Sequence, residues 1–292
     1  TLAPVLTTSF PKNYATNFKG NEIELVFDEY VKLKNVTKQL IVSPPMKKTP
    51  SILPYSASKT IAIKLYDTLL ENTTYSFNFG NSIEDNNEGN KFEQFKYVFS
   101  TGKYIDSLVL NAKVKDAYNN KVDNYVSVML YEINSSNSDS IVYKEVPRYI
   151  TSTLDSLKLV KLENIKEGKY QLVAMKDVNG NNKFDPKTDK IGFQKDVVSI
   201  PNDTLYEIEL FKEELAFKAV NAMQASGNRI TLGYEGNPKD VKIELKKGVE
   251  KIPFKLTKLA SKDSLNIWFK AQKNDSLAVE VVNGKYKKTF AL

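Results

Sequence analysis

The sequence predicts an all-β protein made of tandem β-sandwich modules. Three observations lead to this prediction. Hydrophobic side chains recur at every second position in many short runs, Gly, Asn, Asp and Pro residues separate those runs, and a single segment has a spacing that would fit a helix of several turns. The 292 residues suffice for two or three domains of about 100 to 150 residues each. We therefore expect several modules in series, each with its own core.

The first clear run covers residues 21–30, where Ile23, Leu25 and Phe27 occupy alternate positions. Side chains two residues apart lie on the same face of a strand, so this run predicts a strand with one buried face. The same pattern recurs along the chain at residues 60–67, 74–80, 108–116, 125–133, 169–177, 205–211, 229–234, 241–247, 265–271 and 277–282.

Two segments have a different pattern. Residues 211–224 place Phe211, Leu215 and Ala219 at four-residue spacing, but residues 214–220 also alternate as a strand does. We expect a linker followed by a strand there. Residues 32–40, "KLKNVTKQL", are compatible with a short helical turn.

Polar turn chemistry divides the chain near residues 102 and 213. The predicted modules are residues 1–102, 103–213 and 214–292. The third module is short and ends at Leu292, which leaves open a continuation of the native protein beyond it.

Composition narrows the classes of function. The chain contains no cysteine and no histidine, which removes thiol nucleophiles, imidazole bases and the common zinc and copper ligand sets. No glycine-rich phosphate loop or G-x-S-x-G elbow occurs. We therefore expect a protein that is not an enzyme. No apolar run approaches the roughly 18 residues that a membrane-spanning helix needs.

The net charge of +7 comes from lysines spread along the whole chain, and Arg148 and Arg229 are its two arginines. Readers of nucleic acid favour clustered arginine interleaved with aromatic residues, so we expect no nucleic-acid partner. A weak attraction to anionic lipid or lipopolysaccharide headgroups remains open.

Four phrases follow one another in the first module: "FPKNYATNFKGNEIELVFDEYVKLKN", "QLIVSPPMKK", "KTIAIKLYDTLLENTTYSFNFGNSIEDNNEGN" and "FKYVFSTG". In order and spacing, residues 4–102 resemble the bacterial Ig-like domain that opens many exported lipoproteins of Bacteroidota. The residues also support a sandwich directly. Pro44 and Pro45 cannot donate ladder hydrogen bonds and so end a strand, and Tyr75, Phe77 and Phe79 alternate to fill a core.

The second module contains "LENIKEGKYQLVAMKDVNGNNKFDPKTDKIGF". In this phrase Gly168 turns into a strand carrying Tyr170, Leu172 and Ala174, and the strand leads into a loop rich in Asp and Asn. The module is similar to transthyretin-like, or prealbumin-like, sandwiches of bacterial surface proteins. That resemblance implies a spacer or a binding platform.

The loop "KDVNGNNKFDPKTDK", residues 176–190, is the candidate metal site. Loops supply oxygen ligands to Ca²⁺ from alternate positions, and Asp177, Asn179, Asn181 and Asp185 fit positions 1, 3, 5 and 9 of such a loop. The candidate ligands are Asp177, Asn179, Asn181, the carbonyl of Lys183, Asp185 and Asp189.

Two departures weaken the calcium prediction. Thr188 stands at position 12, where a bidentate Glu is expected, and Asn182 stands at position 6, where glycine is expected. Two interpretations therefore stay open. One is a weak calcium site of the extracellular type. The other is a loop whose Asp and Asn side chains bond its own backbone while Lys183, Lys187 and Lys190 neutralise its acids.

A second acidic cluster, Glu84, Asp85 and Glu88, could suggest the carboxylate pair of a glycosidase. Such a pair faces across a cleft and comes from separate strands. One polar loop with three solvated acids does not provide this arrangement, so we interpret it as a loop of the Ig-like domain. The same argument applies to Asp28 and Glu29.

Most of the aromatic residues fall at alternating strand positions and predict core packing. Five lie in polar or outward-facing contexts and could bind a sugar or a protein partner. These are Tyr14, Phe18, Tyr55, Tyr118 and Trp268.

From the resemblance we expect a non-enzymatic lipoprotein at the outer membrane and cell surface, with a signal peptide and lipid-attachment cysteine upstream of Thr1. Its expected role is that of a structural or interaction subunit of an outer-membrane complex for barrel assembly or export, in contact with a β-barrel or other subunits. A carbohydrate-binding or adhesin protein is the alternative. A glycan-active enzyme with its catalytic domain beyond Leu292 is a more remote one.

Overall fold

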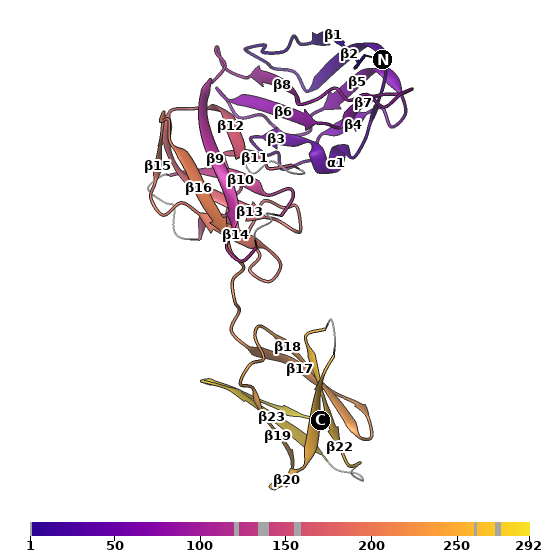
Figure 1. The fold of residues 1–292 in the computed structure, drawn as a ribbon, viewed down its shortest axis with the longest axis vertical. Helices are drawn as coiled ribbons and strands as arrows, with labels where there is room; N and C mark the ends of the chain where they lie inside the picture. Colours follow the sequence, from indigo (N-terminus) through magenta and orange to yellow (C-terminus); the bar gives the residue numbers. More distant parts are fainter. Residues whose placement is uncertain (1, 120–122, 134–139, 155–158, 260–261, 272–275) are drawn as a thin grey trace. The chain divides into compact units, whose positions relative to one another are not determined.

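The computed structural model describes residues 2–119, 123–133, 140–154, 159–259, 262–271 and 276–292. In these residues the chain forms 24 strands and two helices of four residues each. The chain divides into two compact units, the amino-terminal unit Thr1–Lys212 and the carboxy-terminal unit Glu213–Leu292. The predicted all-β fold of β-sandwich modules in series is confirmed (Figure 1).

The first sandwich of the amino-terminal unit packs two sheets around one core. One sheet has the order β1 (Leu6–Phe10), β2 (Glu22–Leu33), β5 (Ser58–Lys64) and β4 (Ser51–Leu53), and β7 (Ile83–Asp85) also pairs with β2. The other sheet has the order β3 (Ile41–Ser43), β6 (Thr74–Gly80) and β8 (Phe95–Ser100). The alternating side chains Phe77 and Phe79 are fully buried between the sheets, as predicted.

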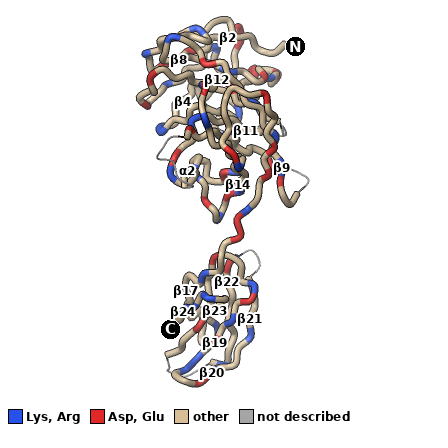
Figure 2. Tube along the Cα trace, turned by 90° about the vertical axis from the view of Figure 1, so that its left-hand side faces the viewer, with Lys and Arg blue, Asp and Glu red and all other residues tan. Residues whose placement is uncertain are grey.

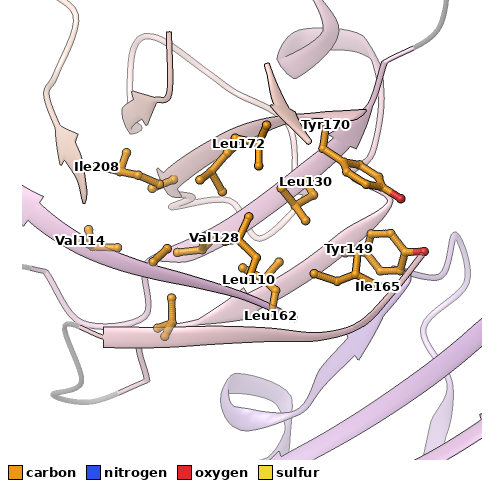
Figure 3. Packing of buried hydrophobic residues seen from close by; sticks show 14 of the residues in the cluster. Leu110, Val114, Val128, Leu130, Tyr149, Leu162, Ile165, Tyr170, Leu172 and Ile208 are labelled. Atoms are coloured by element: carbon orange, nitrogen blue, oxygen red, sulfur yellow. The ribbon is translucent and has the colours of Figure 1, made fainter. Parts of the chain in front are cut away.

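The second sandwich follows in the same unit. One sheet has the order β11 (Tyr149–Ser152), β10 (Ser127–Glu132), β13 (Gly168–Lys176) and β14 (Lys190–Phe193), and β15 (Val198–Ile200) pairs with β13. The other has β12 (Leu159–Ile165), β9 (Leu108–Asp116) and β16 (Leu205–Leu210), with β16 parallel to β9. Leu110, Leu130 and Leu172 meet in the core between these sheets (Figure 3).

The carboxy-terminal unit is a sandwich of two four-stranded sheets. One has the order β17 (Lys218–Ser226), β18 (Arg229–Glu235), β22 (Ser264–Phe269) and β21 (Phe254–Lys258). The other has the order β20 (Glu250–Ile252), β19 (Lys242–Lys247), β23 (Leu277–Asn283) and β24 (Tyr286–Ala291). Ile230, Ile267 and Val279 are fully buried in its core.

Both unusual segments of the sequence form as predicted. Residues 212–217 have no regular structure and β17 begins at Lys218, so residues 211–224 contain a linker and a strand. The short helix α1 (Val36–Gln39) lies in the segment 32–40. The other helix, α2 (Ile141–Lys144), has no counterpart among the predicted elements.

Candidate functional site

The loop that follows β13 is held by its own acidic and amide side chains. Asp177 accepts hydrogen bonds from the backbone N–H groups of Gly180 at 2.7 Å and Asn182 at 2.6 Å. The Oδ1 of Asn181 accepts one from the N–H of Lys183 at 2.8 Å. Asn182 has a φ of 56°, a left-handed conformation that Asn tolerates better than most residues. Asn182 thus takes a backbone conformation that would otherwise call for glycine.

Asp189 closes the other end of the loop from a fully buried position. Its two carboxylate oxygens accept hydrogen bonds from the N–H of Val178 at 3.0 Å and the N–H of Asp185 at 2.9 Å. The hydroxyl of Thr188 also donates to it at 2.9 Å. Asp185 in turn accepts from the N–H of Lys187 at 2.9 Å. Thr188, at the position where a calcium ligand was expected, therefore supports the buried carboxylate.

The predicted calcium ligands can be compared with these contacts. Asp177, Asn181, Asp185 and Asp189 lie in one hydrogen-bonded loop, whereas the side chain of Asn179 is exposed. Across the described residues, no group of three or more acidic side chains is close enough together to hold a metal ion. In the observed arrangement the carboxylates bond the backbone, which is poor geometry for an ion, so the calcium site stays a prediction.

The loop also packs as a cover over the outer face of the sheet that contains β10 and β13. Phe184 at its centre is buried in a small second cluster with Met129, Met175 and Ile191. Its N–H donates to the carbonyl of Val142 in α2 at 2.9 Å. The loop and α2 together therefore shield a sheet face that would otherwise meet water.

Lys190 joins this loop to the preceding polar segment. Its Nζ lies 2.7 Å from a carboxylate oxygen of Asp116 and 2.7 Å from one of Asp123. Burial opposes ionisation of Asp116, but the hydrogen bond and charge of Lys190, together with the backbone N–H groups of Tyr118 and Asn119, outweigh it and hold the pKa of that carboxyl below its usual value. Lys190 therefore balances acids outside the loop, and not those of the loop itself as predicted.

The acidic cluster of the first sandwich is only partly solvated. Glu84 and Asp85 are buried, contrary to the expectation of three solvated acids. Glu84 lies 3.5 Å from the Nζ of Lys32 and 3.5 Å from that of Lys34. These pairs compensate the cost of burying its charge.

Asp85 organises the loop after β7. Its carboxylate accepts backbone hydrogen bonds from Glu88 at 2.6 Å, Asn90 at 2.6 Å and Asn87 at 2.8 Å. The bond from Glu88 is the main cause that lowers the pKa of Asp85. For Glu29, burial and the nearby Asp85 raise the pKa. The cluster serves the loop backbone, and its acids do not face one another across a cleft.

The five aromatic residues that were candidates for binding a sugar or a protein partner differ in exposure. Tyr14, Tyr55 and Tyr118 are exposed to 58%, 93% and 80% of their surface. Phe18 is buried, with its ring centroid 4.3 Å from that of Phe99, so the expectation of an exposed Phe18 was wrong. Trp268 is half-buried, and its indole N–H donates to the Oγ1 of Thr257 at 2.9 Å.

A polar joint connects the two sandwiches of the amino-terminal unit. Asp106 is buried there, accepts a hydrogen bond from the hydroxyl of Thr74 at 2.8 Å and donates its N–H to the same hydroxyl at 2.9 Å. The side-chain amide of Asn164 donates to the carbonyl of Asp106 at 2.9 Å. Asp106 is therefore bonded on both sides, to the first sandwich through its carboxylate and N–H and to the second sandwich through its backbone carbonyl.

Further contacts extend the joint to both sheets of the second sandwich. The guanidinium of Arg148 donates to the hydroxyl of Thr73 at 3.0 Å, and the N–H of Ile150 donates to the hydroxyl of Ser43 at 3.1 Å. Lys96 forms an ion pair with Glu163. Sequence reasoning missed this joint, because each of its residues is an ordinary polar residue and the pairing is long-range.

Grooves on the surface are shallow and mixed in character. One of about 530 Å³ is lined by Lys19, Asp67, Glu71 and Asn72, with Phe18 beside them. Another of about 420 Å³ lies between Phe193 and Phe211 and includes Glu207 and Glu209. Neither pairs a nucleophile with a base. In the part of the chain that the structure describes, no helix has the length and apolar character needed to span a membrane.

Comparison with known proteins gives only remote similarities for the chain as a whole. No curated protein matches the chain. Among solved structures, the S-layer protein rSbsC(31-844) shows 11% identity and a TM-score of 0.24, with 99% of this chain and 54% of that one covered. The chain thus spans about half the length of that protein.

Two further structures are similar at the same low level. The fimbrial anchor protein Mfa2 from Porphyromonas gingivalis has 13% identity and a TM-score of 0.26, covering 62% of this chain and 82% of that one. A DUF3823 family protein from Bacteroides uniformis has 9% identity and a TM-score of 0.22, covering 63% and 96%. The match to a family model is confined to the first sandwich: residues 1–101 match the bacterial Ig-like domain.

Proposed function

We propose that this protein is a non-enzymatic structural or interaction subunit of an outer-membrane protein complex that serves barrel assembly or export. The match of residues 1–101 to a bacterial Ig-like domain supports a role in interaction. Function resides in sites and surfaces more than in a fold, so the proposal rests chiefly on one structural feature, the joint between the two sandwiches of the amino-terminal unit.

The joint supports a role as a rigid spacer. Asp106 is buried, its carboxylate accepts from Thr74 of the first sandwich and its backbone carbonyl accepts from Asn164 of the second, so tilting one sandwich on the other would leave a buried polar group of Asp106 without its partner. An unsatisfied buried group of this kind costs about 1 to 3 kcal/mol or more when charged. A fixed angle between two sandwiches sets the distance between contacts on a large partner.

The proposed location is the cell-surface side of the outer membrane, with a lipid anchor attached upstream of the sequence. Partners would be a membrane β-barrel or other subunits of the same complex, met by loops and sheet edges. No part of this proposal requires nucleic acid.

Purification from native membranes tests the proposal. The full-length protein, affinity-tagged at its carboxy terminus, is isolated from detergent-solubilised outer membranes and its partners are quantified by mass spectrometry. We expect a β-barrel protein in near-stoichiometric amount. Recovery of the protein alone, from membranes in which known complexes stay intact, would contradict the proposal.

The alternative is a carbohydrate-binding or adhesin protein. The observation that favours it is the exposure of Tyr14, Tyr55 and Tyr118, because exposed aromatic rings stack on sugars. Binding of residues 1–292 to a glycan array, lost on replacing these three tyrosines by alanine, would support this alternative.

We also propose calcium as a weak structural ligand of the loop 177–189, with Asp177, Asn179, Asn181, the Lys183 carbonyl, Asp185 and Asp189 as candidates. Binding would require some carboxylates to exchange backbone N–H groups for the ion. Calorimetry with Ca²⁺ and with a chelator checks this. A melting temperature that is unchanged at millimolar Ca²⁺ rules the site out.

A further inference from the structure

The positive charge of the chain is concentrated in the carboxy-terminal unit. Residues 213–292 contain 15 lysine and arginine residues and 9 acidic ones, so they carry +6 of the net charge of +7. Figure 2 shows Lys and Arg distributed over the strands of this unit. A unit of 80 residues with this charge attracts polyanions.

The two sheets of the unit differ in how their charges are paired. On the sheet with β19 and β23, Lys246 lies 3.0 Å from Glu244 and 3.1 Å from Glu280, and Lys287 lies 2.9 Å from Glu280. These lysines of that sheet therefore have acidic partners. The outer face of the other sheet is different.

Cross-strand register places the outward side chains of the β17-β18-β22-β21 sheet in rows. Arg229 of β18 is opposite Trp268 of β22, and Trp268 is opposite Lys255 of β21. Ile230 and Ile267, the neighbours of Arg229 and Trp268 along their strands, are buried on the inner face. Alternation therefore directs the row Arg229, Trp268 and Lys255 outward.

Neither cation in this row has an acidic partner within the described ranges. The guanidinium of Arg229 lies over the Trp268 ring, 5.3 Å from its centroid, and its Nε is buried without a hydrogen-bond partner. Stacking on an indole holds the guanidinium plane in place. Lys255 is exposed beside it. Buried polar atoms are usually satisfied, so an unpaired arginine set in an outward face suggests a missing anionic ligand.

A row of amide and hydroxyl side chains runs alongside. Thr231 of β18 is opposite Asn266 of β22, which is opposite Thr257 of β21. The hydroxyl of Thr231 donates to the Oδ1 of Asn266 at 3.1 Å. Hydroxyl groups such as those of Thr231 and Thr257 bond sugar hydroxyls, and the two cations Arg229 and Lys255 bond carboxylates.

We propose that the outer face of the β17-β18-β22-β21 sheet binds an acidic polysaccharide. Arg229 and Lys255 contact the carboxylates of the sugars, and the hydroxyl groups of Thr231 and Thr257 face the sugar hydroxyls, while Asn266 is buried between them and bonded to Thr231. This site is independent of the proposed function, since a subunit of a membrane complex can carry it as well as an adhesin can.

Trp268 is the single tryptophan of the chain, so its fluorescence reports directly on this face. Purified residues 1–292 are titrated with polygalacturonate, with neutral dextran of equal length, and with poly-L-glutamate, at about 0.15 M salt to screen nonspecific attraction. We expect a saturable change with polygalacturonate, none with dextran, and binding of poly-L-glutamate at least about tenfold weaker.

Matched variants separate the site from net charge. R229Q with K255Q should weaken polygalacturonate binding at least about tenfold, whereas K246Q with K287Q, which removes equal charge from the other sheet, should change it less than about twofold. R229K keeps the charge but lacks the planar guanidinium that donates two parallel hydrogen bonds to a carboxylate. It should therefore still bind several-fold more weakly. Far-UV circular dichroism confirms that each variant is folded.

Three results would overturn the site: no binding by the unaltered chain, equal loss in both double variants, or equal affinity for poly-L-glutamate. The last would indicate an acidic protein as the partner. None of these results bears on co-purification with a β-barrel, so this proposal and the proposed function can fail separately.

Discussion

At the scale of single residues, the same arrangement of a buried carboxylate inside a loop occurs twice in the amino-terminal unit. Asp85 and Asp189 are buried carboxylates that each collect hydrogen bonds from the loop around them. The sequence predicted that both loops contain turns formed by Asp and Asn residues. It could not predict which acid is buried, because that depends on strands far away in the sequence.

The low pKa of Asp85 predicts a stability that depends on pH. A carboxyl whose pKa is lower in the folded state stabilises fully above its unfolded pKa of about 3.8, and this contribution is lost as the pH falls through the lower folded value. D85N should therefore be less stable at pH 7 and show a smaller loss of stability between pH 5 and pH 2. Urea unfolding across this range measures both effects; a D85N chain with the unaltered pH profile would contradict the assignment.

Phe184 is the residue that sequence reasoning missed in the candidate metal loop. It is buried under the loop among Met129 and Met175, so F184A should destabilise the amino-terminal unit by about 3 kcal/mol through the lost contacts and the cavity. V178A, in the same loop but with 59% of the side chain exposed, should cost less than about 0.5 kcal/mol. Chemical denaturation distinguishes them. Equal small effects would mean that the loop does not cover the sheet.

At the scale of elements, alternation predicted the long strands and missed most of the short ones. β2, β6, β13 and β23 fall where the periodic runs predict them, but three-residue strands such as β7 are too short for a period to show. Alternation also assigns each side chain to one face of the sheet, but it does not tell which strands are hydrogen-bonded neighbours. The parallel pairing of β16 with β9 was therefore not predictable from the runs.

Gly192 in β14 lies where β14 closely approaches β16 of the other sheet. A Cβ at this position would lie 2.2 Å from the carbonyl oxygen of Glu209 in β16, which is backbone and cannot move aside cheaply. G192A should cost about 1 to 3 kcal/mol through forced separation of the strands. G20A, where the nearest atom would be 3.4 Å away, is the matched control and should be close to neutral. Thermal unfolding of both variants checks this, and a neutral G192A would contradict the close approach.

At the scale of the whole molecule, the sequence located polar breaks near residues 102 and 213, and the structure divides after Lys212. What the sequence could not supply is the joint within the amino-terminal unit. Thr74, Asp106 and Asn164 come from distant parts of the chain, and nothing in their local patterns marks them as partners. The proposed role as a spacer depends on this joint being stiff.

The most direct test of the account is a distance distribution across the joint. Because the chain has no cysteine, Y55C and L205C at two exposed positions provide unique sites for spin labels, and double electron–electron resonance measures the distance between them. We predict one narrow distribution, broadened when D106A removes the buried carboxylate and retained in the control variant D67A. A broad distribution in the unaltered chain would mean that the two sandwiches move freely, and would contradict the role of a rigid spacer.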